Sequence, residues 1–149
     1  MPSATVHMAA YRGMEVVVLR PEGYALPREI MDKARAAAAA SGGSVRETDD
    51  RADALAGAHV VYAKEWGSTS RYGDAAGDAA LRAGLKDWCV REDWFATAAA
   101  ACRFMHCLPV RRNVAVADEV LDGPRSIVQR EAHNRLPAQM AVLHRLLSA

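Results

Sequence analysis

Short apolar runs alternate with helix-forming segments along most of this chain. The first run, Glu15–Leu19, lies between a glycine-ended segment and an Arg-Pro pair, and the alanine-rich segment 29–40 that follows is a strong helix former. Because parallel strands need long crossover connections, such alternation is typical of a parallel sheet that helices cover on both faces. We therefore predict an α/β, doubly wound fold with five parallel strands. The strands are expected at Glu15–Leu19, Ser44–Thr48, 59–63, Arg103–His106 and 126–129, and the helices at 3–12, 29–40, 53–58, 79–86, 92–101 and 137–147.

The length and composition fit a single domain that spans residues 1–149. A chain of 149 residues, 51% of them hydrophobic, can bury one sizeable core. The formal net charge of +1 provides neither the basic surface of a general nucleic-acid binder nor the high charge of a disordered chain. The sequence contains no apolar run of the roughly 20 residues that a membrane span needs, and no signal-peptide pattern. Its three irregularly spaced cysteines fit reduced thiols. We expect a cytoplasmic protein that binds neither nucleic acid nor membranes.

Polar side chains follow three consecutive strands of the predicted sheet. Lys64 comes directly after the third strand, segment 106–111 (His-Cys-Leu-Pro-Val-Arg) ends the fourth, and segment 131–135 (Glu-Ala-His-Asn-Arg) follows the fifth. In open parallel sheets, ligands bind outside the carboxyl ends of the strands. Taken alone, Lys64 fits a surface lysine that covers apolar area, and segment 131–135 fits a solvated helix start. Their joint place at one edge of the sheet favours a binding site.

The segment that ends the fourth strand carries the richest chemistry in the chain. Its Leu-Pro bond can be cis at little cost and can then turn two backbone carbonyls toward a ligand, beside which Arg111 can hold an anion. His106 and Cys107 also fit a core histidine and an inert buried thiol. Because adjacent residues in a strand point to opposite faces, we do not expect a Cys-His nucleophile. A zinc site of Cys102, His106 and Cys107 lacks the usual ligand spacing, so we expect neither a metal nor a cofactor.

Four segments resemble those of N-acetylornithine and N-succinylornithine carbamoyltransferases, in the same order. They are 20–24 (Arg-Pro-Glu-Gly-Tyr), 61–66 (Val-Tyr-Ala-Lys-Glu-Trp), 104–113, which contains His-Cys-Leu-Pro, and 131–135. After the third strand, ordinary ornithine carbamoyltransferases carry an acidic-Trp and Ser-Met-Gly loop, whereas this chain has Ala-Lys-Glu-Trp-Gly. Ala115 stands where the acetylornithine enzymes carry a lysine and the succinylornithine group an aliphatic residue. The chain is thus similar to the C-terminal, amino-acid-binding domain of this family.

The resemblance implies roles for the polar groups at the strand ends. Lys64 and Leu108 would bind the acylated amino acid, whereas Cys107, Leu108, Arg111 and Arg135 would complete the carbamoyl phosphate site. We expect His106 and Arg111 to act in catalysis. The implied reaction moves a carbamoyl group from carbamoyl phosphate to the side-chain amine of an N-acylornithine, a step of arginine biosynthesis. The sequence identifies no base that would take the proton from this amine.

The resemblance also implies partners and a topology. The family's first domain holds a Ser-x-Arg-Thr-Arg motif for carbamoyl phosphate that this sequence lacks, so we expect the chain to be inactive without an N-terminal carbamoyl phosphate domain. Members of the family are homo-oligomers, with trimers expected, and they carry a trefoil knot. Here the loop 21–27 would be threaded by segment 64–74. Two alternatives stay open: a non-catalytic ligand-binding or regulatory module derived from this domain, and half of an ordinary ornithine carbamoyltransferase.

Overall fold

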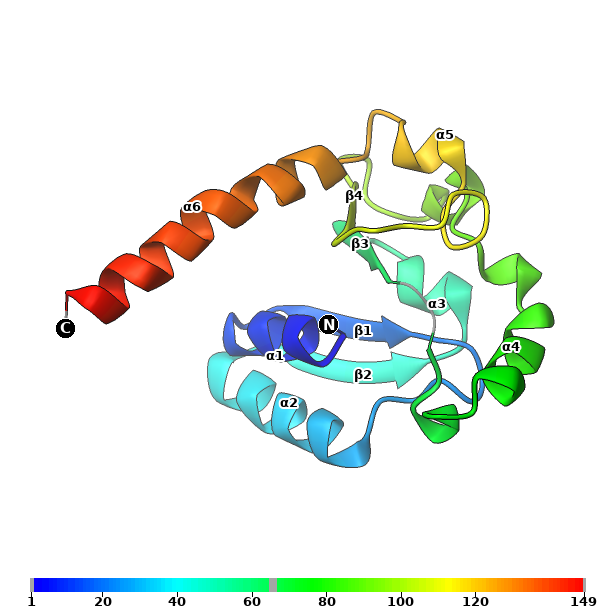
Figure 1. Cartoon of the computed structure of the whole chain (residues 1–149), viewed down its shortest axis with the longest axis horizontal. Coiled ribbons are helices and arrows are strands. Elements are labelled where there is room, and N and C mark those ends of the chain that lie inside the picture. The colour runs from blue at the N-terminus through cyan, green and yellow to red at the C-terminus, as the bar shows by residue number, and fades with distance from the viewer. Residues whose placement is uncertain (1, 65–66, 149) are drawn as a thin grey trace.

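The computed structural model describes residues 2–64 and 67–148 of the chain. The helices are α1 (Pro2–Tyr11), α2 (Arg28–Ser41), α3 (Arg51–Leu55), α4 (Ala75–Ala83), α5 (Asp118–Leu121) and α6 (Val128–Leu147). The strands are β1 (Glu15–Leu19), β2 (Ser44–Thr48), β3 (Val60–Ala63) and β4 (Arg103–His106), and the 3₁₀ helices are η1 (Thr69–Arg71), η2 (Lys86–Trp88) and η3 (Glu92–Phe95). Figure 1 shows α1 and α2 beside β1 and β2, and α6 extending away from the rest of the molecule.

The strands pair in parallel, as the sequence predicts. β1 pairs with β2, with Val17 opposite Arg46, and β3 pairs with β4, with Tyr62 opposite Met105. A helix follows each of the first three strands along the chain, which is the order that parallel pairing requires. The α/β class with parallel strands and helices is therefore confirmed.

The pairing differs in extent from the predicted five-stranded sheet. Within the described ranges, the named strands form two separate two-stranded ladders. The predicted strand at 126–129 contributes one parallel bridge, between Phe104 and Ser126, because α6 begins at Val128 and leaves too few extended residues for a ladder. The Phe104 N–H donates to the Arg125 carbonyl and the Ile127 N–H donates to the Phe104 carbonyl, both at 2.9 Å. The fifth strand is thus reduced to a short contact along β4.

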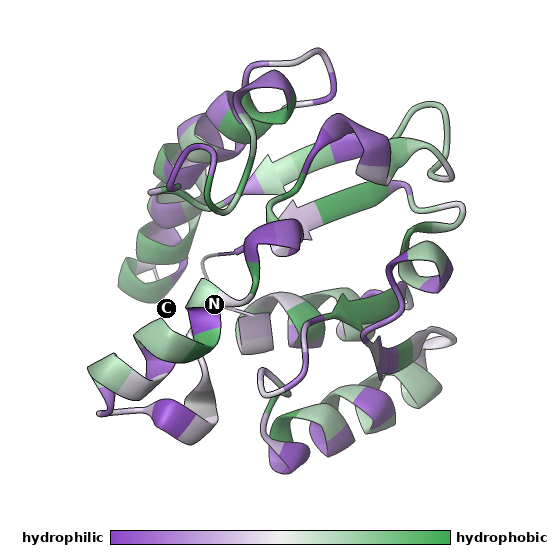
Figure 2. Cartoon of the chain, turned by 90° about the vertical axis from the view of Figure 1, so that its right-hand side faces the viewer, coloured by the Kyte–Doolittle hydropathy of each residue, from purple (hydrophilic) through white to green (hydrophobic). Residues whose placement is uncertain are grey.

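Both faces of β1 are packed. Val16 and Val18 pack against a core that α1 and α2 form with β2. Because successive strand residues point to opposite faces, Leu19 packs instead against a second core, built around Phe104 and Val116. The buried residues of α2, which are Met31, Ala34 and Ala38, recur every three to four positions as in an amphipathic helix. Figure 2 shows hydrophobic stretches along the strands, while the helices carry both hydrophobic and hydrophilic residues.

The helices predicted at 92–101 and 79–86 differ from those in the structure. Segment 92–101 forms only the 3₁₀ helix η3, because its second half bonds to an earlier loop: the Gly57 N–H donates to Thr97 (2.8 Å) and the Ala99 N–H donates to Ala58 (3.1 Å). These tertiary bonds override the helix propensity of the alanines. The helix predicted at 79–86 begins earlier, as α4, because the Asp74 carboxylate accepts a hydrogen bond from a backbone N–H in its first turn at 2.9 Å.

The closing helix α6 is longer than the helix predicted at 137–147. It begins at Val128 and continues through Pro137. Every residue from 132 to 147 is exposed, so the first turn of α6 is the part that packs against the described structure. In Figure 1 the helix extends from the end of β4 past the rest of the chain.

The loop at 21–27 contacts the segment that follows β3. The Ser68 hydroxyl, which is buried, donates a hydrogen bond to the Gly23 carbonyl at 2.7 Å. This contact brings together the two parts of the chain that the predicted knot involves. Glu65 and Trp66, which belong to the predicted threading segment, lie outside the described residues, and the knot stays a prediction.

Candidate functional site

The turn after β4 has an unusual backbone that a buried histidine holds in place. The Leu108–Pro109 peptide bond is cis, and Leu108 has a φ of 50°, in the left-handed region that few leucines adopt. The His106 ring is fully buried, and its Nδ1 accepts a hydrogen bond from the Leu108 N–H at 3.0 Å. In a neutral ring this bond places the proton on Nε2. His106 therefore acts on the turn from inside the core.

A carboxylate from α6 joins the ends of β3 and β4. The Tyr62 hydroxyl donates to Glu131 Oε1 at 2.6 Å, and the His106 backbone N–H donates to Glu131 Oε2 at 3.1 Å. Burial, and then the hydrogen bond and negative charge of Glu131, raise the pKa of Tyr62 well above its ordinary value, with a smaller contribution from Cys107. The tyrosine hydroxyl therefore remains a donor at neutral pH.

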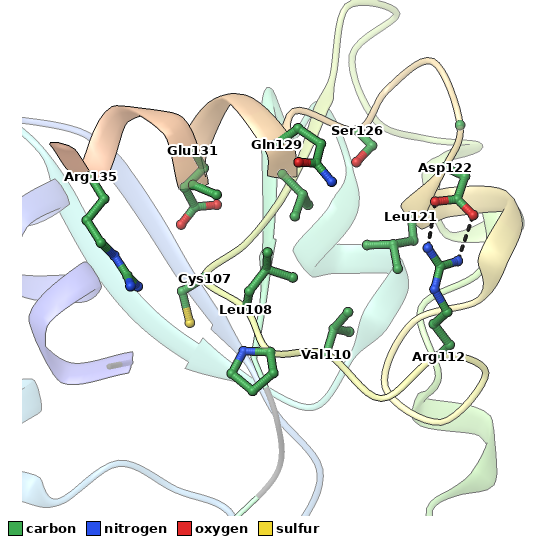
Figure 3. Close-up of a pocket in the computed structure, with 14 residues that line it drawn as sticks. Cys107, Leu108, Val110, Arg112, Leu121, Asp122, Ser126, Gln129, Glu131 and Arg135 are labelled. Atoms are coloured by element: carbon green, nitrogen blue, oxygen red, sulfur yellow. Dashed lines mark hydrogen bonds and ion pairs between the residues drawn. The ribbon is translucent and has the colours of Figure 1, made fainter. Parts of the chain in front are cut away.

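The turn after β4, the end of α5 and the start of α6 line a cleft of about 1090 Å³ at the carboxyl edge of β4. One wall is the turn that contains Cys107 and Leu108, and another is the start of α6, from which Glu131 and Arg135 point toward that turn (Figure 3). The cleft therefore combines backbone groups of a strained turn with two arginines, of which Arg112 is paired with Asp118 and Asp122. Such a combination can orient a polar ligand and neutralise an anionic one.

The structure brings three of the predicted binding residues together. Cys107, Leu108 and Arg135 line the same cleft, although Arg135 lies more than 20 positions beyond the turn in the sequence. Arg111 is exposed in the same loop, beside the lining of the cleft. A ligand in the cleft can therefore contact the thiol, the turn and the Arg135 guanidinium.

Lys64 lies at the same edge of the sheet but apart from this cleft. It is half-buried and directly follows Ala63, which pairs with His106 across the ladder. As far as the described residues define the cleft, Lys64 is absent from its lining. The structure thus places Lys64 near the fourth strand's end without bringing it against Arg135.

Arg112 ties the loop after the turn to α5, a role that the sequence motif does not indicate. Its guanidinium donates to Asp118 at 2.7 Å and to the two carboxylate oxygens of Asp122 at 2.6 and 2.8 Å (Figure 3 shows the Asp122 pair). These bonds hold the pKa of each carboxyl group below its usual range and raise the pKa of Arg112. The six- and ten-residue separations follow no helical or strand period, so only the folded loop brings these groups together.

The thiols differ in their access to solvent. Cys89 and Cys102 are buried, and burial raises the pKa of each thiol, so both stay neutral. Cys107 is half-buried in the cleft. Neither described range holds a cluster of three or more His, Cys, Asp or Glu side chains that is arranged for a metal ion. Within those same ranges, no helix has both the length and the apolar character to cross a membrane.

Comparison with known proteins identifies relatives along almost the whole chain. Residues 1–146 match the family described as "Aspartate/ornithine carbamoyltransferase, Asp/Orn binding domain". The N-acetylornithine carbamoyltransferase of Xanthomonas campestris pv. campestris is 38% identical over 146 residues, which are 97% of this chain and 43% of that protein. The ornithine carbamoyltransferase of Clavibacter michiganensis subsp. michiganensis is 41% identical over 138 residues, which are 93% of this chain and 44% of that protein.

Solved structures agree with the sequence matches. A crystal structure of N-acetyl-L-ornithine transcarbamylase superimposes with a TM-score of 0.89 at 37% identity and covers 96% of this chain and 44% of that one. A structure of acetylornithine transcarbamylase complexed with acetylcitrulline gives the same TM-score and identity. The chain spans less than half the length of the relatives it matches. Because the family match covers residues 1–146 and the fold agrees, the chain belongs to the aspartate/ornithine carbamoyltransferase family, in which it corresponds to the Asp/Orn binding domain.

Proposed function

We propose that this chain is the amino-acid-binding domain of a carbamoyltransferase that acts on an N-acylornithine, in arginine biosynthesis. The observation that carries the proposal is the cleft in which the Cys107–Leu108 turn faces Arg135. A related N-acetyl-L-ornithine transcarbamylase was solved with carbamyl phosphate and N-succinyl-L-norvaline, and another with acetylcitrulline. Both kinds of ligand suit a site that offers a cation for phosphate and backbone groups for an amine.

In the proposed mechanism, the cleft supplies orientation and charge rather than a nucleophile. The lone pair of the neutral side-chain amine attacks the carbamoyl carbon and forms a C–N bond. The tetrahedral oxyanion then collapses, the bond from the carbon to the phosphate oxygen breaks, and phosphate leaves with that electron pair and accepts a proton from the amine. Backbone carbonyls of the turn accept hydrogen bonds from the amine, and Arg111 and Arg135 neutralise the phosphate. No cofactor takes part, and His106 contributes by holding the turn.

We propose an acylated acceptor because the end of β3 carries a positive charge. Free ornithine carries an α-ammonium group, whereas an N-acyl derivative carries a neutral amide and leaves the α-carboxylate as its dominant charge. Lys64 is a half-buried cation at this edge, suited to the carboxylate and repelled by an ammonium group. This argument favours N-acetyl- or N-succinylornithine over ornithine.

The proposal includes a second domain that binds carbamoyl phosphate. The relatives are more than twice as long as the stretch that this chain matches. We propose that the remaining part of such an enzyme, N-terminal in the resembling family, supplies the other phosphate-binding groups. The three cysteines are free, which fits the reducing cytoplasm as the compartment of this reaction.

A chimera tests the proposed function. It joins this chain to the N-terminal part of the Xanthomonas campestris N-acetylornithine carbamoyltransferase, replacing the part of that enzyme that this chain matches. The chimera is expected to release phosphate from carbamoyl phosphate only when an ornithine derivative is present, while this chain alone releases none. A well-folded chimera without acceptor-dependent release would contradict the enzymatic proposal and favour a ligand-binding or regulatory module.

A second candidate is half of an ordinary ornithine carbamoyltransferase. The observation that favours it is the 41% identity to the Clavibacter michiganensis ornithine carbamoyltransferase, against 38% to the Xanthomonas campestris enzyme. The two candidates share the reaction and differ in the α-nitrogen of the acceptor, so acceptor preference in the chimera separates them.

A further inference from the structure

Besides the backbone bond that Ile127 donates to Phe104 just before α6, one side chain of α6 forms polar contacts with the strands in the described part of the chain. Within α6, all of whose residues the structure describes, Val128 is buried and Glu131 half-buried, while the other residues are exposed. Val128 packs among apolar side chains of the second core, a contact without directional bonds. Glu131 is therefore the side chain that can set the direction in which the helix leaves the sheet.

Glu131 uses both carboxylate oxygens, one for each strand. Oε1 accepts the Tyr62 hydroxyl of β3 at 2.6 Å, and Oε2 accepts the backbone N–H of His106 in β4 at 3.1 Å. Two bonds to different strands fix a side chain in position and orientation, as a single bond would not. His106 also holds Leu108 through its ring, so the same residue connects the carboxylate to the turn.

Arg135 lies four residues after Glu131, which places both on one face of α6. Both line the cleft, and both point toward Cys107 and Leu108 in Figure 3. Since the residues from 132 onward are exposed, the position of Arg135 relative to the Cys107–Leu108 turn depends on the first helical turn of α6, which Glu131 anchors. A tilt of α6 at Glu131 would move the guanidinium away from the turn.

We propose that Glu131 is a positioning residue, whose carboxylate fastens the first turn of α6 to the ends of β3 and β4 and thereby aims Arg135 at the Cys107–Leu108 turn. The fastening follows from contacts within this chain, whereas the consequence for phosphate binding by Arg135 rests on the proposed function. An acidic residue in the first turn of a helix also interacts favourably with the helix dipole, and this simpler role needs a control. Glu29 provides it, because it is an exposed acidic residue in the first turn of α2.

A double-mutant cycle in the chimera tests the positioning of Arg135. Glu131→Gln removes one of the two acceptor oxygens, because the amide nitrogen cannot accept from Tyr62 or His106. We expect Glu131→Gln and Arg135→Met each to raise the KM for carbamoyl phosphate by about tenfold or more, with a smaller effect on the KM for the acceptor. The double variant is expected to have the same KM for carbamoyl phosphate as Arg135→Met alone, because Glu131 then has no arginine to position. Glu29→Gln should change neither KM. If Glu131→Gln raised the KM for carbamoyl phosphate by the same factor in the wild type and in the Arg135→Met variant, the proposal would be overturned.

Hydrogen exchange in this chain alone tests the fastening independently of any activity. Glu131→Gln and Tyr62→Phe are expected to speed exchange in residues 128–135 several-fold, and Glu131→Gln also at the His106 amide, while the unfolding midpoint shows that both variants remain folded. Glu29→Gln should leave exchange in these segments unchanged. Unchanged exchange in the Glu131→Gln variant would overturn the proposal even if the chimera is active. A chimera without turnover, combined with faster exchange, would contradict the proposed function and leave the fastening supported.

Discussion

Individual residues at the strand ends divide into those that hold the backbone and those that face the cleft. His106 is fully buried and accepts a hydrogen bond from the Leu108 N–H, so its ring shapes the turn, and its expected part in catalysis stays a prediction. Cys107 and Arg135 face the cleft instead. The His-Cys-Leu-Pro motif thus contains one residue that holds the backbone and one that faces the cleft, and only the fold distinguishes them.

Lys64→Met is expected to weaken binding of an N-acylornithine to the chimera by about 2 kcal/mol, the lower end of the range for a desolvated charge pair, because Lys64 is only half-buried. The measurement is a calorimetric titration with N-acetylornithine. Lys86→Met serves as the control, because Lys86 is an exposed lysine of η2 and its replacement should not change affinity. Equal affinities of the wild type and Lys64→Met would remove Lys64 from the site.

Arg112→Met is expected to lower the free energy of unfolding at neutral pH and to have no effect in strong acid. Arg112 lowers the pKa of Asp118 and Asp122 in the folded state below the ordinary value of 3.8. The stabilisation is therefore present above about pH 4 and is lost as the pH falls through the lowered pKa values. Since these groups are exposed, the effect should be modest and should weaken in high salt. Denaturant unfolding between pH 2 and pH 7 measures it, and a stability difference that persists unchanged at pH 2 would contradict the pairing.

Along the chain, strands were more predictable from the sequence than helices. Glu15–Leu19, Ser44–Thr48 and Arg103–His106 have the predicted bounds, because each is a short segment between helix-forming or turn residues. Segment 92–101 does not form the predicted α-helix, because residues 57 and 58 form hydrogen bonds with its backbone. A local sequence pattern does not reveal a contact between segments that lie so far apart in the chain.

In the candidate site, too, the local motifs were predictable from the sequence and the long-range contacts were not. The Cys107–Leu108 turn and Arg135 were predictable from their motifs, and the structure brings them to one cleft. The bond between Tyr62 and Glu131 joins residues 69 positions apart, so it depends on how α6 meets β3. The sequence contains both residues but no sign of their contact.

Pro137→Ala is expected to stabilise the second half of α6. Pro137 lies inside the helix, where it cannot donate a backbone hydrogen bond, and alanine is about 3 kcal/mol more favourable than proline in a helix interior. The measurement is amide hydrogen exchange in residues 137–147, which should become slower. Ala141→Gly is the opposing control, with an expected cost of about 1 kcal/mol and faster exchange. Exchange that stays unchanged after Pro137→Ala would show that α6 tolerates the proline at no cost.

At the scale of the whole molecule, one side of α6 carries exposed apolar side chains. Its exposed apolar residues, which recur at helical spacing, are Leu136, Met140, Leu143, Leu146 and Leu147. Exposed stripes of this kind mark contact surfaces between proteins or drive association. By resemblance to the family, we propose that this side packs against the carbamoyl phosphate domain and that the assembled enzyme is a homo-oligomer.

We predict that the chain alone associates as its concentration rises. Met140→Glu combined with Leu143→Glu should shift it toward the monomer, because both residues are more than half exposed on α6. Sedimentation velocity over a range of concentrations measures the effect. Tyr72→Glu is the control, because Tyr72 is 96% exposed and lies outside α6. A clean monomer at high concentration would contradict the prediction.

Competition between two acceptors tests the proposed function most directly. The chimera receives ¹³C-labelled carbamoyl phosphate together with equal concentrations of N-acetylornithine and ornithine, and NMR quantifies the two carbamoylated products. Because Lys64 favours the α-carboxylate and repels an α-ammonium group, we expect carbamoylated N-acetylornithine to predominate. Carbamoylated ornithine in equal or greater amount would assign the chain to the ordinary ornithine enzymes, and the absence of both products would contradict a carbamoyltransferase function.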